Sequence, residues 1–273
     1  MIFAVWPPLT SDYRFCAKKS LGQNYLKDPN IIRKIIESAH IQKEDSLLEI
    51  GPGPGALTAL LLSKPVKSFV AIEKDSQFIP YWESMKTHNP HFHIYQGDAL
   101  KIKLASLPHP HPFKIISNLP YNVGTQIIIN WLEELPLVHS MTLMLQKEVV
   151  IRMTEGPGTK DYGRLSILMQ WLCNVERVFD IPPTAFRPQP KVTSSVVRII
   201  PREKPLFPAQ KNLLEKVTAL AFQQRRKMIK KSLQGLFENT ENVLKELGID
   251  PSARPERLSI EEFCAIARAL ERG

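Results

Sequence analysis

SLLEIGPGPG, residues 46–55 of this 273-residue chain, is the stretch that decides the fold. Its first five residues predict a short buried strand, and the next five form a glycine-rich turn. The residues from Ala56 to Leu61 then place apolar side chains at helical spacing. A strand, a glycine-rich turn and a helix in this order are typical of a sheet that binds a ligand at the carboxyl ends of its strands. A plain tight turn is the alternative interpretation.

The spacing of the glycines limits the class of ligand. Gly51, Gly53 and Gly55 alternate with other residues, which lets the backbone approach a ligand closely. This spacing differs from the dinucleotide pattern G-x-G-x-x-G, and no lysine of a phosphate-binding loop follows it. The turn therefore favours a nucleoside without phosphates over a ligand that contains a pyrophosphate.

Helical and extended segments alternate on both sides of this turn, from about residue 28 to residue 198. Asp28 and Pro29 predict the start of a helix, because an N-cap acceptor precedes a proline that suits the first turn. Strands separated by segments of helical length predict a parallel sheet covered by helices on both faces. The further strands are predicted at residues 69–72, 92–95, 113–116, 141–145 and 194–200.

The pattern changes after residue 200. Pro201, Pro205 and Pro208 indicate a linker, and the segments beyond them show only helical periodicity. The sequence therefore predicts an α/β fold with a small C-terminal helical domain, divided near residues 203 and 204.

Composition excludes several classes of protein. Hydrophobic residues make up 43% of the chain and charged residues 23%, which excludes a disordered chain. No apolar run approaches the roughly 18 residues of a membrane span, and residues 1–8 lack the features of a signal peptide. Cys16, Cys173 and Cys264 are too far apart to indicate a disulfide framework or a metal site. We therefore expect a soluble protein in the reducing cytoplasm.

Positive charge is concentrated in one segment. The formal net charge is +9, and residues 211–231 carry seven basic residues against one acid, Glu215. Concentrated positive charge is typical of a protein that binds a polyanion. A solvated helix face is the alternative, and charge alone does not decide between them.

Acidic residues follow two further strands at the edge where the glycine turn lies. Glu73 ends the second strand, where a carboxylate can accept hydrogen bonds from both hydroxyls of a ribose. Asp98 follows the third strand, where it can accept a hydrogen bond from an adenine amino group. Three such features at the ends of three successive strands favour a ligand site over solvated side chains. The ligand that they suit is S-adenosylmethionine, because it has an adenosine and no phosphate.

The fourth strand ends in Asn118-Leu119-Pro120-Tyr121, which suits methylation of an aromatic amine. The lone pair of adenine N6 is delocalised into the ring, so this nitrogen is a poor nucleophile. The side-chain carbonyl of Asn118 and the backbone carbonyl of Leu119 can each accept an N–H bond and direct the lone pair toward the methyl group. Tyr121 offers a ring on which an extruded base can stack. No general base is needed before transfer, because the resulting cation loses its proton readily.

In these motifs the chain resembles the ribosomal RNA small-subunit adenine N6,N6-dimethyltransferase family (KsgA/RsmA). The resemblance runs from about residue 18 to the C-terminus. The matching stretches are residues 19–26, 49–58, 72–75, 97–100, 118–123, 162–166, 186–192 and 222–227.

The resemblance implies a role for particular residues. It implies stacking of the target adenine by Tyr121 and by Phe186. For Phe186, core packing is the alternative. It implies that the basic C-terminal residues bind RNA phosphates without reading sequence. The implied cofactor contacts are Asn24, Leu26, Gly51, Glu73, Asp98 and Asn118, and the implied RNA contacts are Arg225, Arg226, Lys227, Lys230 and Lys231.

The resemblance also implies a domain organisation and an activity. Residues 1–17 form an N-terminal extension, residues 18–203 a Rossmann-like class I methyltransferase domain and residues 204–273 a helical RNA-binding domain. The implied activity is transfer of methyl groups from S-adenosylmethionine to N6 of two adjacent adenosines in the 3′-terminal hairpin of small-subunit (16S) rRNA. The implied partner is an immature ribosomal subunit, and we expect a cytoplasmic monomer that contacts no membrane.

Two other functions remain as alternatives. One is a large-subunit rRNA adenine methyltransferase of the antibiotic-resistance type, which shares the fold. The other is a ribosome-assembly or transcription factor that is chiefly non-catalytic. We expect no metal, since the histidine clusters at residues 88–93 and 109–111 lack a Cys-x-x-Cys partner. Trp131 and Trp171 lie in apolar helical patterns and are predicted to be core residues.

Overall fold

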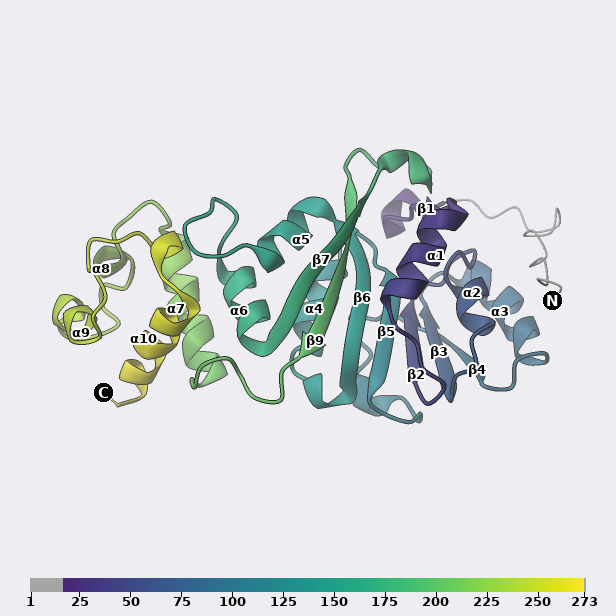
Figure 1. Ribbon diagram of the computed structural model, residues 1–273, viewed down its shortest axis with the longest axis horizontal. Coiled ribbons are helices and arrows are strands. Elements are labelled where there is room, and N and C mark those ends of the chain that lie inside the picture. The colour runs from purple at the N-terminus through teal and green to yellow at the C-terminus, as the bar shows by residue number, and fades with distance from the viewer. Residues whose placement is uncertain (1–16, 273) are drawn as a thin grey trace. The chain divides into compact units, whose positions relative to one another are not determined.

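The computed structural model describes residues 17–272, without the side chains of Lys19 and Arg272 (Figure 1). The predicted extension at residues 1–17, including Cys16, therefore lies outside the described residues except for its last residue. The described chain forms two compact units. The first comprises residues 17–147 and 176–201, and the second comprises residues 148–175 and 202–272.

A seven-stranded sheet forms the centre of the first unit, in the order β4-β3-β2-β5-β6-β9-β7. The pairs β2–β3, β3–β4, β2–β5 and β5–β6 are parallel, as predicted. The strand order changes direction between β2 and β5, where an α/β sheet opens a crevice for ligands. The strands are β2 (Ser46–Ile50), β3 (Ser68–Glu73), β4 (Phe92–Gln96), β5 (Phe113–Asn118), β6 (Val138–Gln146), β7 (Cys173–Ile181) and β9 (Ser194–Pro201).

The sheet differs from the predicted one at one edge. β9 pairs with β6 in antiparallel fashion, with Met141 opposite Ile199, so the sheet is mixed. β7 was not predicted, because charged residues such as Glu176 interrupt its apolar pattern and most of its side chains keep some exposure. A strand that is solvated on one side gives no continuous hydrophobic run in the sequence.

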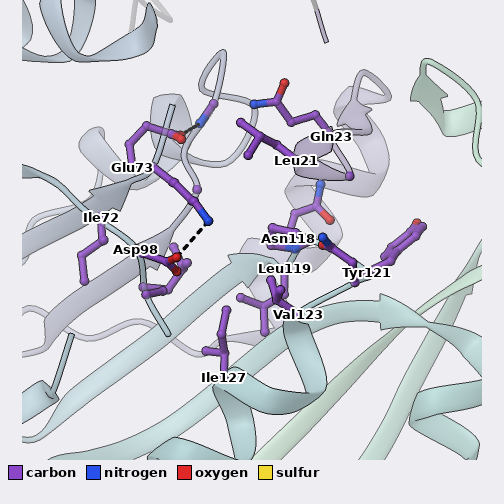
Figure 2. Close-up of a pocket in the computed structure, with 18 of the residues that line it drawn as sticks. Leu21, Gln23, Ile72, Glu73, Asp98, Asn118, Leu119, Tyr121, Val123 and Ile127 are labelled. Atoms are coloured by element: carbon purple, nitrogen blue, oxygen red, sulfur yellow. Dashed lines mark hydrogen bonds and ion pairs between the residues drawn. The ribbon is translucent and has the colours of Figure 1, made fainter. Parts of the chain in front are cut away.

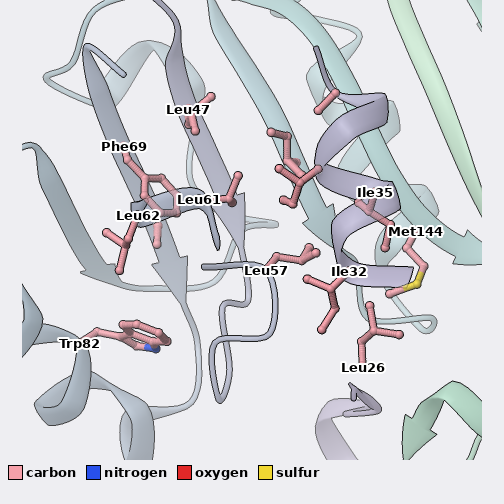
Figure 3. Close-up of a cluster of buried hydrophobic side chains, with 14 of the residues drawn as sticks. Leu26, Ile32, Ile35, Leu47, Leu57, Leu61, Leu62, Phe69, Trp82 and Met144 are labelled. Atoms are coloured by element: carbon pink, nitrogen blue, oxygen red, sulfur yellow. The ribbon is translucent and has the colours of Figure 1, made fainter. Parts of the chain in front are cut away.

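Helices cover the sheet and bury its central strands on both faces. Alternate residues of β3 point to opposite faces, yet Phe69 and Val70 are both fully buried. Figure 3 shows one of these layers, where Ile32 and Ile35 of α1 pack with Leu61. The helices of this unit are α1 (Pro29–Ser38), α2 (Thr58–Leu62), α3 (Ile79–Lys86) and α4 (Gly124–Trp131), with single 3₁₀ turns at Lys19–Leu21, Ser76–Phe78, Leu104–Ser106, Leu135–Leu137 and Pro183–Ala185.

The start of α1 confirms the predicted capping. The side chain of Asp28 accepts hydrogen bonds from the backbone N–H groups of Asn30 at 2.9 Å and Ile31 at 3.2 Å. Pro29 occupies the first turn, where its missing N–H costs nothing.

The second unit is helical and is larger than the predicted C-terminal domain. Its core joins Tyr162, Ile167 and Trp171 to Val217 and Phe263, so residues 148–175 are grouped with the C-terminal helices. The predicted division assigned those residues to the sheet domain, because their place in the chain precedes the proline-rich linker. The helices of this unit are α5 (Lys147–Thr154), α6 (Arg164–Leu172), α7 (Lys211–Gln223), α8 (Ile229–Ser232), α9 (Thr240–Glu246) and α10 (Ile260–Arg272), with a 3₁₀ turn at Pro255–Arg257.

A short antiparallel pair joins β1 (Tyr25–Leu26) to β8 (Phe186–Arg187), far apart in the sequence.

Within residues 17–272, no helix combines the length and the apolar character that crossing a membrane requires.

Candidate active site

A cavity lies at the carboxyl ends of β2, β3, β4 and β5 (Figure 2). It lies where the strand order changes direction, which is where ligands bind in α/β sheets. Residues 20–25 and the turns after these four strands line it. The predicted residues that line it are Asn24, Gly51, Glu73, Asp98, Asn118, Leu119 and Tyr121, whereas Leu26 and Phe186 do not.

The glycine turn after β2 has positive φ angles, which residues with a side chain rarely adopt. Gly51 has a φ of +66° and Gly55 a φ of +95°. A Cβ atom on Gly55 would lie 2.5 Å from Cη2 of Trp82, while a Cβ on Gly51 would meet no atom within 4 Å. Gly55 therefore allows close packing behind the turn, and Gly51 leaves its cavity side open to a ligand.

The carboxylate of Glu73 is held firmly beside this turn. Its Oε2 atom accepts a hydrogen bond from the backbone N–H of Gly53 at 2.9 Å, and its Oε1 atom from that of Asp75 at 2.7 Å. Burial raises the pKa of Glu73, and these two hydrogen bonds offset part of that rise. Each carboxylate oxygen keeps a second lone pair, so the fixed side chain can still accept a bond from a ribose hydroxyl.

Asp98 has a basic partner that the sequence did not indicate. Lys74 Nζ lies 2.8 Å from Asp98 Oδ2, and Figure 2 draws this ion pair beside the cavity. The backbone N–H of Leu100 donates to Oδ1 at 3.1 Å. The contact with Lys74 is the main cause that lowers the pKa of Asp98, so this carboxylate is ionised at neutral pH. A single lysine after Glu73 gave no sequence signal for this pairing.

A second glutamate is buried behind the turn. Glu49 is 2% exposed, and its Oε2 atom has no hydrogen bond within the described residues. Burial is the main cause that raises its pKa to about 8, although a contact with the Thr58 hydroxyl opposes the rise. The carboxyl group is therefore largely neutral at pH 7.

Asn118 and Leu119 each present a carbonyl oxygen that accepts no hydrogen bond from a described residue. The amide nitrogen Nδ2 of Asn118 donates to the backbone oxygen of Asn24 at 3.0 Å, which fixes the orientation of the side chain. The oxygen Oδ1 of Asn118 then lies on the other side of the amide group. No described donor reaches this oxygen or the backbone oxygen of Leu119. Both are free to accept the N–H bonds of an exocyclic amine.

Tyr121 is anchored by a residue far along the chain. Its hydroxyl group forms a short hydrogen bond with the hydroxyl of Ser194, a fully buried residue at the start of β9. Burial raises the pKa of Tyr121, and the bond to Ser194 opposes the rise. The ring is therefore held by its hydroxyl end while its face remains available at the cavity. Sequence reasoning missed Ser194, since nothing near it in the chain points to Tyr121.

Phe186 and Leu26 lie in the core. They face each other in the β1–β8 pair, and their side chains are 2% and 4% exposed. Both belong to the apolar cluster shown in Figure 3, where Leu26 is labelled. The arrangement favours the core-packing interpretation of Phe186. Stacking by Phe186 and cofactor contact by Leu26 stay predictions.

The basic segment of the second unit contains two kinds of cation. Arg225 donates from Nη2 to the backbone oxygen of Thr159 at 3.2 Å, and Lys230 Nζ lies 2.9 Å from a carboxylate oxygen of Glu241. These two side chains are half-buried and serve the fold. Of the five predicted RNA contacts, Arg226, Lys227 and Lys231 are exposed and form no ion pair with a described residue.

The histidine clusters form an aromatic contact. The rings of His93 and His109 lie 4.4 Å apart, and His109 Nε2 is 2.8 Å from the hydroxyl of Tyr95. Burial is the main cause that lowers the pKa of both histidines. Across residues 17–272, no three His, Cys, Asp or Glu side chains are grouped to hold a metal. Trp131 and Trp171 are buried, as predicted.

Comparison with known proteins identifies similar sequences and folds. The sequence model of ribosomal RNA adenine dimethylase matches residues 14–272. The chain is 46% identical to ribosomal RNA small subunit methyltransferase A of Rhizobium etli over 258 residues, 93% of each chain. It is 43% identical to the protein of the same name from a Ruegeria species over 274 residues, 98% of each chain.

Two crystal structures are similar over nearly the whole chain. A dimethyladenosine transferase from Plasmodium falciparum has a TM-score of 0.80 and 26% identity, covering 90% of this chain and 97% of that one. The 23S rRNA methyltransferase ErmE has a TM-score of 0.68 and 27% identity, covering 91% of this chain and 100% of that one.

Proposed function

This chain belongs to the ribosomal RNA adenine dimethylase family, and from that premise we propose a role for each part of its cavity. The protein is a small-subunit (16S) rRNA adenine N6,N6-dimethyltransferase that uses S-adenosylmethionine. Its targets, in our proposal, are two adjacent adenosines of the 3′-terminal hairpin in an immature small subunit. Methylation of that hairpin then belongs to small-subunit maturation.

The residues of the cavity fit S-adenosylmethionine. Glu73 accepts the ribose hydroxyls, and the ionised Asp98 accepts a hydrogen bond from the adenine amino group. Gly51 leaves open space beside the turn, which a closely approaching ligand would need. The acids suit the positive charges of this cofactor, and Lys74 is the one basic residue among the described residues that line the cavity, so a phosphate would find no basic cluster there. When bound, the cofactor supplies an electrophilic methyl group on a sulfonium.

Asn118 and Leu119 prepare the acceptor nitrogen. The free oxygens Oδ1 of Asn118 and O of Leu119 accept the two N–H bonds of adenine N6. Two acceptors on one side draw the nitrogen toward a pyramidal geometry and leave its lone pair directed away from them. Catalysis then rests on alignment and on exclusion of water more than on a base. The fixed amide of Asn118 is the single observation that supports this assignment most strongly.

Tyr121 holds the extruded base. A base taken out of its helix loses its stacking partners, and an aromatic ring replaces them. The bond to Ser194 keeps the ring of Tyr121 in one orientation, so little freedom is lost when the base arrives. The exposed cations Arg226, Lys227 and Lys231 bind phosphates, whereas Arg225 and Lys230 hold their own segments together.

Asn118→Ala tests the central role. We expect methyl transfer to fall by at least 100-fold, while affinity for RNA changes less than threefold, since the side chain acts on one nitrogen. Asn242→Ala, the same change at an exposed site in α9, is the matched control. Turnover of the Asn118 variant within tenfold of the native rate would contradict the assignment. Binding of the inactive variant to immature subunits would separate an assembly role from catalysis.

The RNA surface is tested by the salt dependence of binding. Reversal of Arg226 and Lys227 to glutamate should reduce the slope of log K against log salt by about 0.7–0.9 per lost phosphate contact. Reversal of Lys43 and Lys67, two exposed lysines of the first unit, makes the same change of net charge. An equal effect of both pairs would mean that only net charge matters.

The choice of RNA is tested by the product. Labelled cofactor is incubated with unmethylated small subunits or with naked large-subunit RNA, and the nucleosides are measured by mass spectrometry. We expect labelled N6,N6-dimethyladenosine from small subunits. Label in the large-subunit RNA alone would support the alternative that the similarity to ErmE keeps open.

The remaining expectations follow from the substrate. Ribosomal subunits assemble in the cytoplasm of bacteria such as the relatives above, so we propose that the protein works there. We also propose that the protein is a monomer and that the transfer needs no metal, since alignment of the reactants carries the chemistry.

A further inference from the structure

The segment before β1 closes one side of the cavity. Residues 18–25, which we call the strap, contribute six consecutive lining residues from Ser20 to Tyr25. In Figure 2, Leu21 and Gln23 border the cavity on the side opposite Ile127. Contacts with the rest of the first unit hold the strap in this position.

Asp75 makes the most concentrated of these contacts. Its side chain is fully buried and accepts four hydrogen bonds. Oδ1 accepts from Lys18 Nζ at 2.7 Å and from the backbone N–H of Gln77 at 3.2 Å. Oδ2 accepts from Gln23 Nε2 at 3.0 Å and from Gln77 Nε2 at 2.6 Å. Two of the four donors thus belong to the strap, and both carboxylate oxygens take part.

Gln23 connects Asp75 to the rest of the strap through hydrogen bonds. Its Oε1 atom accepts from the backbone N–H of Lys18 and from the hydroxyl of Tyr25, each at 2.7 Å. The strap is therefore folded around one amide group whose other end is bound to Asp75. The next residue, Asn24, offers the backbone oxygen that orients Asn118.

A second feature ties the strap to the loop of Asn118. Gly22 has a φ of +64°, and a Cβ atom there would lie 3.1 Å from Oδ1 of Asn122. The strap thus passes close to the Asn118–Asn122 loop at Gly22 and at Asn24. The contacts form a continuous path from Asp75 through Gln23 and the strap to the amide of Asn118.

We propose that Asp75 is a positioning residue of the methyl transfer, which latches the strap over the cofactor and through it fixes the amide of Asn118. This inference rests on the proposed function. Asp75 does not line the cavity, so its effect passes through the strap and not through a contact with the cofactor. Capping of the 3₁₀ turn at Ser76–Phe78 is a separate role, which needs only the bond from Gln77 N–H.

Asp75→Asn separates these roles. Asparagine keeps one oxygen for the cap, but it removes the charge that pairs with Lys18 and places an amide nitrogen against other donors. We expect affinity for S-adenosylhomocysteine to fall about 10- to 100-fold, the range for loss of hydrogen bonds to a charged group. We also expect a reduced kcat at saturating cofactor and faster hydrogen exchange in residues 18–25.

Asp45→Asn is the matched control. Asp45 Oδ2 lies 2.6 Å from Lys114 Nζ, in a buried ion pair at the opposite ends of the strands. This change should lower the melting temperature and leave cofactor affinity, kcat and exchange of the strap unchanged. If both variants lower stability and neither alters affinity or kcat, Asp75 is only structural and the proposal fails.

Lys18→Met gives a second, milder route to the same result. Lys18 is half-exposed and does not line the cavity, so its loss should leave the fold intact. We expect a weaker loss of affinity than for Asp75→Asn, and no further loss when the two changes are combined. Additive losses would overturn the latch.

Failure of the proposed function has a different signature. Native protein that binds S-adenosylhomocysteine but methylates no adenosine would refute the function, and the affinities would still decide the role of Asp75. Native protein that binds no cofactor would overturn both.

Discussion

Replacing Glu49 by glutamine should stabilise the protein increasingly as the pH rises. Glu49 is 2% exposed, and burial raises its pKa from the usual 4.5 to about 8. An acid with a raised pKa binds its proton more tightly in the folded state than in the unfolded state. Its contribution to stability is therefore full below pH 4.5 and is lost as the pH rises toward 8. Glutamine stays neutral throughout and avoids this loss.

The structure gives the size of the effect. Each pKa unit between the folded and unfolded values corresponds to about 1.36 kcal/mol. The pKa rises from 4.5 to about 8 on folding. Between pH 4.5 and pH 9, the free energy of unfolding of Glu49→Gln should therefore increase by about 5 kcal/mol relative to that of the native protein. An amide has nearly the same size and shape as a neutral carboxyl group, so little is lost at acidic pH.

Urea unfolding of both proteins between pH 5 and pH 9 measures this difference, with the fluorescence of the buried Trp82 as one signal. Groups that titrate alike in both proteins cancel in the comparison. Glu37→Gln changes an exposed acid of α1 in the same way and should give a constant difference. A difference for Glu49→Gln that is equal at pH 5 and pH 9 would refute the reasoning, because the carboxyl group would then be ionised at no extra cost.

Other changes test the packing around the cavity. Gly55→Ala should cost about 2–5 kcal/mol in urea unfolding, from strain at a φ of +95° and overlap with Trp82, and a cost below 0.5 kcal/mol would contradict the close contact. Phe186→Leu should keep methyl transfer within about threefold if the ring is a core element. A loss of tenfold or more at unchanged stability would instead support stacking by Phe186. Tyr121→Phe removes the bond to Ser194 but keeps the ring, so we expect a loss of a few-fold, against about 10- to 100-fold for Tyr121→Ala. Equal losses in both variants would show that the hydroxyl, not the ring, is what matters.

Local patterns predicted most of the sheet and its edge. The strand, turn and helix around Gly51 form as predicted, and Glu73, Asp98 and Asn118 line one cavity. These predictions succeed because the carboxyl ends of parallel strands must meet at one edge, whatever the details of the packing.

Contacts between distant segments could not be predicted. Ser194 binds Tyr121 across 73 residues, and Gln23 binds Asp75 across 52. No periodicity records such pairs, because each residue type is common and its partner is set by the whole fold. The grouping of Tyr162 and Trp171 with the C-terminal helices has the same origin, since it depends on a shared core.

Phe186 shows that a local motif can suggest a role that tertiary packing does not favour. Its motif suggests an aromatic platform, yet an aromatic residue at the start of a short strand can equally fill the core. The β1–β8 pair turns its side chain inward, opposite Leu26. Burial of a large apolar side chain stabilises the fold by about 1.5–3 kcal/mol, which is enough to decide its position in the absence of a base.

Four acids near the glycine turn show how local environment gives one residue type different tasks. Glu49 is buried without a basic partner and is largely neutral, so it adds no charge behind the turn. Asp75 is paired with Lys18, and two of its four hydrogen bonds come from the strap. Asp98 is paired with Lys74 at the cavity wall.

Glu73 is then the one acid lining the described cavity whose charge no lysine or arginine side chain balances. Its two bonds come from backbone N–H groups, which fix its orientation without neutralising it. A positively charged ligand in the cavity would supply the missing balance and lower the pKa of Glu73 toward its usual value. Binding of the cofactor should therefore release protons from Glu73, and affinity should rise with pH across the range in which Glu73 loses its proton. The product of the donor lacks the sulfonium charge, so Glu73 attracts it less strongly than the donor. The same carboxylate therefore favours binding of the donor and, after transfer, replacement of the product by a new donor molecule.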